Sequence, residues 1–217
     1  MDAIALTLAG NGATVGVATL GTALTDRQAD LLCPYIRADG TGILVATDND
    51  PAGYQAAERM FWQLTTRGDD PRRLALPDGL DPADLFHSDG ATALRTAIDT
   101  SPNLAGALLD ARLTPVEQNR STANIRAALR DMGAIITAVP PSRWLDFIDR
   151  VTEVLGVPPG TVHRAVLDTE PIVAPCRRTT TSPHQMSRLT PLSENHHRTG
   201  PTGQPSRGTP PDRHHSR

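Results

Sequence analysis

Residues 43–53 read Ile-Leu-Val-Ala-Thr-Asp-Asn-Asp-Pro-Ala-Gly and carry the strongest indication of fold class in the sequence. Its first five residues form a short, continuous apolar run, which is typical of a strand buried on both faces of a parallel sheet. Pro51 suits the first position of a helix, and Asp50 before it can cap that helix. The stretch therefore predicts a strand, a short acidic loop and a helix in immediate succession.

The flanking segments repeat this alternation of strand and helix. Residues 14–18 are predicted to be a strand because the run is β-branched, and residues 74–76 because they form a short apolar run; turn residues follow both. Helices are expected over residues 2–9, from the capping residue Thr25 to Ile36, from Pro51 to Gly68, and, as a short helix, from Asp81 to Phe86. Strands spaced by helices of this length imply a parallel sheet with right-handed crossovers. We therefore predict an α/β domain over residues 1–88.

Residues 89–170 have a different pattern, with helical periodicity and no convincing strand. The expected helices cover residues 91–100, 104–112, 116–132, 143–155 and 161–167. Ser142 can cap the fourth of these helices, and Gly156 can end it. This part of the chain is predicted to be a small all-α module that follows the sheet domain.

Residues 171–217 differ from both preceding parts in composition. They contain 7 Arg, 2 acidic residues, 8 of the 19 prolines and no Phe, Trp or Tyr, so their formal charge is +5, whereas that of residues 1–170 is −8. Such a segment cannot bury enough apolar surface to offset the loss of chain entropy. We expect a disordered Pro/Arg/His-rich tail, whose arginines could contact a nucleic acid.

Carboxylates supply the candidate chemistry. Asp48 and Asp50 follow the central strand, and Asp81 and Asp84 follow the next one, so all four are expected at the edge formed by the carboxyl ends of the strands. Two carboxylates two residues apart can share a cation, and Mg²⁺ uses one or two carboxylates together with water and phosphate. Asp50 and Asp81, which each precede a proline, can equally be helix caps. Spacing alone leaves both interpretations open.

Composition excludes several classes of protein. No apolar run approaches the length of about 20 residues that a spanning helix needs, so no membrane partner is expected. The first residues lack the basic stretch of a secretory signal, and two cysteines do not make a disulfide scaffold, which favours a cytoplasmic location. A phosphate-binding loop of the type G-x-x-x-x-G-K-[ST] is also missing, so the sequence gives no support for a helicase or NTPase.

Three segments in order resemble the toprim domain of bacterial replicative DNA primases. They are Val17-Ala-Thr-Leu-Gly-Thr-Ala-Leu-Thr25, the stretch 43–53, and Leu76-Pro-Asp-Gly-Leu-Asp-Pro-Ala-Asp-Leu85. Each motif alone is weak, but three in order at the right separations are specific. The likeness covers roughly residues 1–88, and the helical region to about residue 170 is similar to the helices that follow toprim in those enzymes.

The resemblance implies metal-dependent synthesis of RNA primers on single-stranded DNA. The cofactor would be Mg²⁺ or Mn²⁺, and the partners would be single-stranded DNA and ribonucleotides, with a replicative helicase as a further candidate. Asp48 and Asp50 match the family's catalytic, metal-binding pair, and Asp81 matches a further acid close to the metal. Supporting positions are Asp2, Gly21, Thr22 and Asp84.

The sequence also departs from the family pattern. The family's glutamate and the first strand that carries it precede the position of Met1, as do a basic lobe and a zinc-binding module. Asn49 replaces the usual glycine between the aspartates, and Pro51 and Tyr54 stand where relatives are often basic. We therefore expect the chain to be a fragment of a longer reading frame that makes little or no primer alone.

Two other functions compete with primer synthesis. The first is a non-catalytic remnant that binds nucleic acid or a replication partner through the helical module and the Arg-rich tail. The second is a relative of the toprim nucleases and topoisomerases. Topoisomerases need a nucleophilic tyrosine in another domain, and Tyr35 and Tyr54 lie inside expected toprim helices, which argues against that role.

Overall fold

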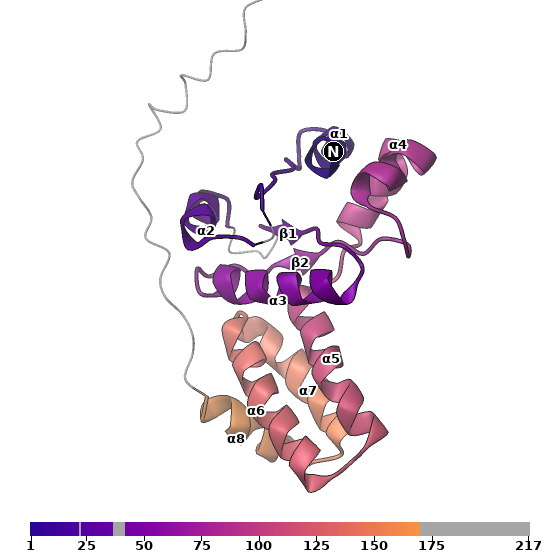
Figure 1. Cartoon of the computed structure of the whole chain (residues 1–217). Helices are drawn as coiled ribbons and strands as arrows, with labels where there is room; N and C mark the ends of the chain where they lie inside the picture. The colour runs from indigo at the N-terminus through magenta and orange to yellow at the C-terminus, as the bar shows by residue number, and fades with distance from the viewer. Residues whose placement is uncertain (22, 37–41, 170–217) are drawn as a thin grey trace, which may run out of the picture. The chain divides into compact units, whose positions relative to one another are not determined.

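The computed structural model describes residues 1–21, 23–36 and 42–169. Helices and two short strands alternate in the first half of this region, and helices alone fill the second half (Figure 1). The elements are α1 (Asp2–Gly10), α2 (Asp26–Leu32), η1 (Cys33–Tyr35), β1 (Leu44–Val45), α3 (Pro51–Thr65), β2 (Arg72–Arg73), α4 (Pro82–Asp99), α5 (Leu104–Gln118), α6 (Thr122–Ala138), η2 (Pro141–Arg143), α7 (Trp144–Leu155) and α8 (Pro159–Leu167).

The two strands form a small parallel sheet that separates two sets of helices. Leu44 pairs with Arg72, and Val45 pairs with Arg73. Because successive residues of a strand point to opposite faces, Val45 and Arg73 share one face. On that face Val45 packs into a core with α3, and on the other face Leu44 packs against α1 and α4. Figure 1 shows α3 on one side of the sheet and α1 with α4 on the other.

The strands are shorter than the sequence predicts, and one predicted strand is wrong. The predicted strand over residues 43–47 is reduced to β1, and the strand predicted at 74–76 lies instead at β2. Residues 14–18 form no strand; Val15 and Val17 are 71% and 68% exposed. A β-branched segment stabilises a sheet only through neighbours that pack against it, and this segment has no ladder partner in the described part of the chain.

The starts of α2 and α3 follow the predictions, because N-caps depend on local sequence, but the helix predicted from Thr25 to Ile36 ends at Leu32 and continues as η1. Thr25 caps α2, and the Thr25 and Gln28 side chains accept from each other's backbone N–H in a capping box. Asp50 caps α3, and Pro51 is its first residue. Ala57, Phe61 and Leu64 form the buried stripe of α3, whereas Met60 is only half-buried.

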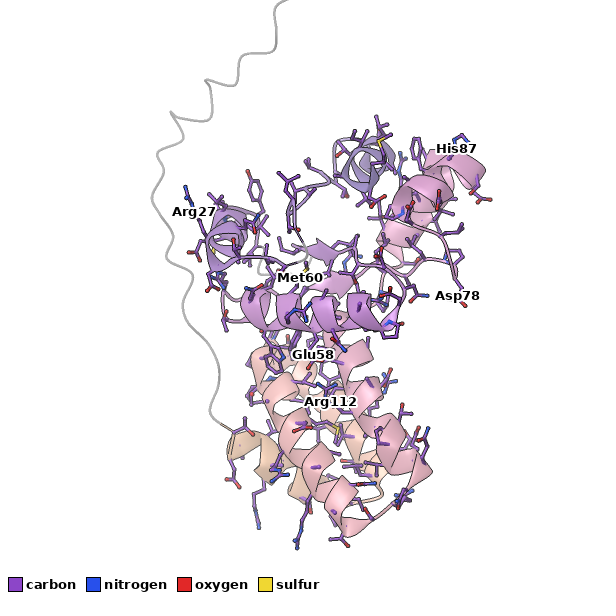
Figure 2. The ribbon with its side chains drawn as sticks, viewed as in Figure 1. Arg27, Glu58, Met60, Asp78, His87 and Arg112 are labelled. Atoms are coloured by element: carbon purple, nitrogen blue, oxygen red, sulfur yellow. The ribbon has the colours of Figure 1, made fainter. Side chains whose placement is uncertain are left out.

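Helices α5 to α8 pack into a bundle whose core is continuous with the α3 face of the sheet. Glu58 of α3 and Arg112 of α5 form an ion pair between these two parts, and Figure 2 shows both side chains at this boundary. The single helix predicted over residues 116–132 is wrong. Instead, α5 continues through Pro115 to Gln118, and a new helix begins after Ser121, whose hydroxyl accepts from the Asn124 N–H.

Other predicted boundaries in the bundle have mixed outcomes. Gly156 ends α7 in the left-handed conformation, as predicted, but Ser142 lies within η2 and does not cap the helix. The predicted domain boundary after residue 88 falls inside α4, which contains a non-helical residue at Gly90, so the division remains a prediction. The predicted tail over residues 171–217 lies outside the described residues. Within the described ranges, no helix is long and apolar enough to cross a membrane.

Candidate functional site

The acidic residues lie in two segments that each follow a strand of the sheet. Asp48 and Asp50 follow β1, and Asp78 and Asp81 follow β2. Because the strands are parallel, both segments leave the same edge, at the carboxyl ends of the strands. Figure 2 shows Asp78 in the turn that precedes α4.

Two of these aspartates are helix caps, as one of the two interpretations predicts. Asp50 Oδ1 accepts from the Gly53 N–H at 2.6 Å at the start of α3. Asp81 Oδ1 accepts from the Asp84 N–H at 2.6 Å at the start of α4. The remaining carboxylate oxygen of each residue has no hydrogen bond to the described residues, so capping does not preclude a bound cation.

A hydrogen bond joins the two acidic segments. Asn49 Nδ2 donates to Asp78 Oδ1 at 2.8 Å, and the Tyr54 hydroxyl donates to Asn49 Oδ1 at 3.2 Å. These bonds connect the loop after β1, the first turn of α3 and the turn after β2. The sequence gives Asn49 and Tyr54 only as departures from the family pattern, and the structure assigns both a contact.

Gly53 allows the first turn of α3 to pack directly on the Asp48 backbone. A Cβ atom at this position would lie 2.1 Å from the Asp48 carbonyl oxygen. No side chain fits there without moving the backbone. The glycine therefore fixes the distance between the acidic loop and the start of the helix.

Arg73 is a feature of the site that the sequence analysis missed. Its side chain is 7% exposed, its Cζ atom lies 3.9 Å from the centre of the Tyr54 ring, and its Nη2 donates to the Asp48 carbonyl oxygen at 3.1 Å. Its Nε is buried and, within the described part of the chain, has no hydrogen-bond partner. No sequence signal marks this residue, because its position depends on the pairing of β1 with β2.

The carboxylates fit a loosely held divalent cation better than a closed metal cage. Asp48 and Asp50 are exposed, and Asp81 is half-buried. Among residues 1–21, 23–36 and 42–169, no three His, Cys, Asp or Glu side chains converge as a cluster able to hold a metal ion. Mg²⁺ often binds one or two carboxylates and completes its shell with water and phosphate, which suits exposed oxygens of this kind.

The supporting residues of the sequence analysis lie at several places. Asp2 lies in the first turn of α1. Asp84 lies in the first turn of α4, and its backbone N–H donates the capping hydrogen bond to Asp81. Gly21 is exposed and follows Leu20, which has a positive φ of 55°. Thr22 lies outside the described residues. Their roles in metal or nucleotide binding remain predictions.

A buried acid lies just before β2, at the other end of that strand from the candidate site. Asp69 is 1% exposed, and the backbone N–H groups of Asp70 and Ile43 stabilise its carboxylate only in part. Burial, together with the charge of neighbouring Asp70, raises the pKa of Asp69 from 3.8 to about 7. Asp70 differs, because Arg143 forms an ion pair with it. Asp69 thus makes folding depend on pH without belonging to the acidic edge.

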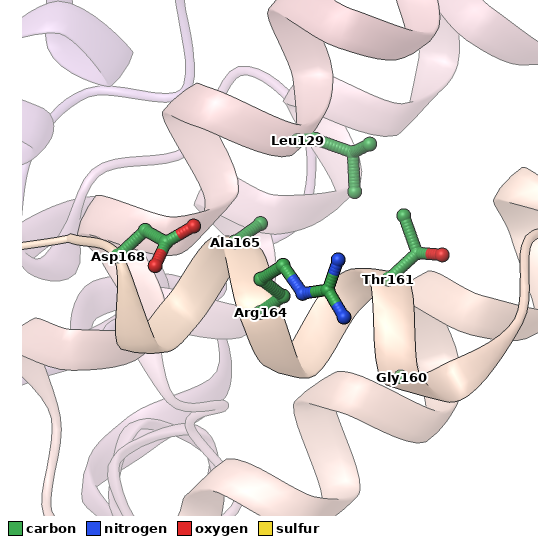
Figure 3. A pocket seen from close by; sticks show the side chains of 6 residues that line it. All are labelled: Leu129, Gly160, Thr161, Arg164, Ala165 and Asp168. Atoms are coloured by element: carbon green, nitrogen blue, oxygen red, sulfur yellow. The ribbon is translucent and has the colours of Figure 1, made fainter.

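A shallow hollow in the surface lies in the helical bundle, far in sequence from the acidic edge. Figure 3 shows it between α6 and α8, lined by Leu129, Gly160, Thr161, Arg164, Ala165 and Asp168. None of the candidate site residues lines it. It therefore gives no independent support for a nucleotide site at the sheet edge.

Comparison with known proteins gives one family match and several primase relatives. A family model described as Toprim-like matches residues 1–86. A DNA primase of Clostridium acetobutylicum is 28% identical over 144 residues, which are 65% of this chain and 23% of the primase. A DNA primase of Campylobacter jejuni is 40% identical over 100 residues, which are 46% of this chain and 15% of the primase.

Solved primase structures share the fold. A primase domain from Pseudomonas aeruginosa has a TM-score of 0.58 at 25% identity, and the match covers 76% of this chain and 51% of that one. The Escherichia coli primase catalytic core has a TM-score of 0.59 at 25% identity, with 73% and 50% covered. A primase catalytic domain bound to single-stranded DNA has a TM-score of 0.57. The chain thus spans about half of these solved cores and less than a quarter of the curated relatives.

Proposed function

We propose, on the premise that residues 1–86 are a toprim domain of the bacterial primase type, that this chain is the metal-binding part of a primer-synthesising nucleotidyltransferase. The observation that carries the proposal is the hydrogen bond between Asn49 and Asp78, which holds the two acidic segments together at one edge of the sheet. Active-site residues of open parallel sheets gather at this edge.

In this proposal Asp48 and Asp50 hold a Mg²⁺ or Mn²⁺ ion, and Asp81 lies close to it. The ion would neutralise phosphate charge and favour attack of a 3′-hydroxyl on an α-phosphate. The chain's own contribution is geometric: helix α3 fixes Asp50 through its cap, helix α4 fixes Asp81 in the same way, and Asn49 connects the two loops.

Single-stranded DNA and ribonucleotides are the proposed substrates, with a replicative helicase as a further partner. A relative bound to single-stranded DNA and another bound to double-stranded DNA support contact with nucleic acid. The rest of a primase core would have to supply the template-binding surface, since the chain matches only about half of such a core. We therefore expect weak or no primer synthesis by this chain alone.

A titration with Mn²⁺ tests the metal site directly. The signal of free Mn²⁺ in electron paramagnetic resonance reports how much ion the purified chain binds. We expect weak binding by the wild type, a loss of at least about tenfold in affinity on Asp48→Ala, and no change on Asp131→Ala, which removes an exposed acid of α6. Equal binding by Asp48→Ala and the wild type would refute the site.

A primer assay separates synthesis from simple binding. The chain is incubated with single-stranded DNA, labelled ribonucleotides and Mn²⁺, with and without a relative's core that carries an alanine at each aspartate matching Asp48 and Asp50. Labelled product that appears only in the mixture, and only with intact Asp48, supports a catalytic role. DNA binding without product under all conditions would favour the non-catalytic alternative.

A further inference from the structure

Arg73 is a buried cation, and within the described ranges no acidic side chain forms an ion pair with it. The arginines that do form ion pairs there are Arg67, Arg112, Arg143 and Arg150. A buried guanidinium without a carboxylate partner is costly, because it loses the hydration of its charge. Its presence beside the acidic loop therefore calls for a role other than stability.

The contacts of Arg73 fix one atom of the acidic loop from two sides. Its Nη2 donates to the Asp48 carbonyl oxygen at 3.1 Å, and the first turn of α3 packs against that same oxygen at Gly53. With this carbonyl held, the peptide plane between Asp48 and Asn49 is restrained. Because Gly53 also packs close to the Asp48 nitrogen, the backbone that sets the direction of the Asp48 side chain is restrained as well.

The guanidinium group of Arg73 stacks on the ring of Tyr54. The Cζ atom of Arg73 lies 3.9 Å from the centre of the Tyr54 ring, a cation–π contact that strengthens when water is excluded. The same tyrosine donates its hydroxyl to Asn49, which donates to Asp78. Arg73 therefore connects, through one ring, to both acidic segments.

We propose that Arg73, stacked on Tyr54, is a positioning residue that orients Asp48 for a divalent cation. The proposal rests on the proposed metal site and deepens it. Arg73 does not touch the cation; it acts through the Asp48 backbone and, by way of Tyr54 and Asn49, sets the spacing of the acidic loop from the turn at Asp78.

Removal of the Arg73 charge distinguishes positioning from simple repulsion. A positive charge that merely lies near the cation weakens its binding, so Arg73→Met would then bind Mn²⁺ more tightly. Positioning predicts the opposite: a loss of about tenfold for both Arg73→Met and Arg73→Lys, comparable to one hydrogen bond to a charged group. Arg73→Lys keeps the charge but cannot reproduce the flat, stacked fork.

Arg72→Met is the matched control. Arg72 is the neighbour of Arg73 on β2 and points to the opposite face, where its Nη1 donates to the Ile98 carbonyl at 3.0 Å. Its substitution removes the same charge and a similar hydrogen bond. We expect Mn²⁺ affinity within about twofold of the wild type for this variant.

Two tyrosine variants keep the test valid if the arginine variants unfold. Tyr54→Phe keeps the ring under Arg73 and loses the bond to Asn49, whereas Tyr54→Leu removes the ring. Tyr54 is exposed, so both are expected to fold by circular dichroism. Positioning predicts a larger loss of Mn²⁺ affinity for Tyr54→Leu than for Tyr54→Phe.

The outcomes distinguish the positioning role of Arg73 from the proposed metal site on which it rests. Asp48-dependent binding that weakens in folded Arg73 and Tyr54→Leu variants, but not in Arg72→Met, supports the positioning role. Asp48-dependent binding that stays equal or tightens in those variants overturns the positioning role and leaves the metal site intact. Binding that does not depend on Asp48 overturns both.

Discussion

Asn49 and Asp78 are 29 residues apart in sequence, and a 2.8 Å hydrogen bond from Asn49 Nδ2 to Asp78 Oδ1 joins them. The bond connects the loop after β1 to the turn after β2 at the carboxyl edge of the sheet. Because a glycine at position 49 would have no side chain to donate, this connection depends on the asparagine of this chain.

The Asn49–Asp78 bond should contribute measurable coupling. A double-mutant cycle with Asn49→Ala and Asp78→Ala, followed by urea unfolding, is expected to give a coupling energy of about 0.5–1.5 kcal/mol. Strictly additive effects of the two substitutions would mean that the two segments are independent in solution.

Gly53→Ala should destabilise the protein strongly. The added methyl would meet the Asp48 carbonyl oxygen, a backbone atom that cannot move cheaply, so we expect a loss of about 2 kcal/mol or more in unfolding free energy. Gly160→Ala in α8 is the control, because nothing lies within 4 Å of its position and alanine favours a helix. Equal effects of the two substitutions would contradict the close packing at Asp48.

The substitution Asp50→Asn should distinguish the role of Asp50 as a helix cap from its role as a metal ligand. Asn caps helices about as well as Asp, so Asp50→Asn is expected to keep the unfolding free energy within about 0.5 kcal/mol while it weakens Mn²⁺ binding. Asp50→Ala should lose both binding and about 1 kcal/mol of stability. Unchanged Mn²⁺ affinity in Asp50→Asn would leave Asp50 as a cap alone.

Asp69 should make stability fall as the pH rises. Burial raises the pKa of Asp69 to about 7, so the folded chain binds a proton more tightly than the unfolded chain, whose aspartate titrates near 3.8. Stability conferred by this proton is fully present below about pH 4 and is lost as the pH approaches and passes 7, at up to about 1.4 kcal/mol per pH unit.

The matched variant is Asp69→Asn, which cannot ionise. Chemical unfolding at pH 4.5, 6 and 8 should show the variant close to the wild type at the lowest pH and progressively more stable above it. A constant difference across the three pH values would mean that Asp69 titrates at its ordinary value.

Local sequence predicted the helix caps, and tertiary contacts decided what it failed to predict. Thr25, Asp50 and Asp81 cap the helices that follow them, because each cap needs only a side-chain oxygen and the next turn of backbone. Residues 14–18 have β-branched side chains but no ladder partner in the described part of the chain. A high β-propensity alone does not make a strand when no neighbouring strand pairs with the segment.

The same distinction applies to the site. Asp48, Asp50 and Asp81 could be chosen from the sequence, since each follows a predicted strand. Arg73 and its ring partner Tyr54 could not, because their contact exists only when β2 pairs with β1 in this register and α3 covers that face. The break between α5 and α6 was a missed local signal, since Ser121 is a capping residue.

Paramagnetic broadening by Mn²⁺ can show whether one ion lies between the two acidic segments, as the proposed metal site requires. In amide NMR spectra with substoichiometric Mn²⁺, we expect the signals of residues 48–50 and 78–84 to broaden together, and Asp48→Ala to abolish both effects. Broadening confined to one segment, or spread over unrelated exposed acids such as Asp131, would contradict a shared cation at the sheet edge.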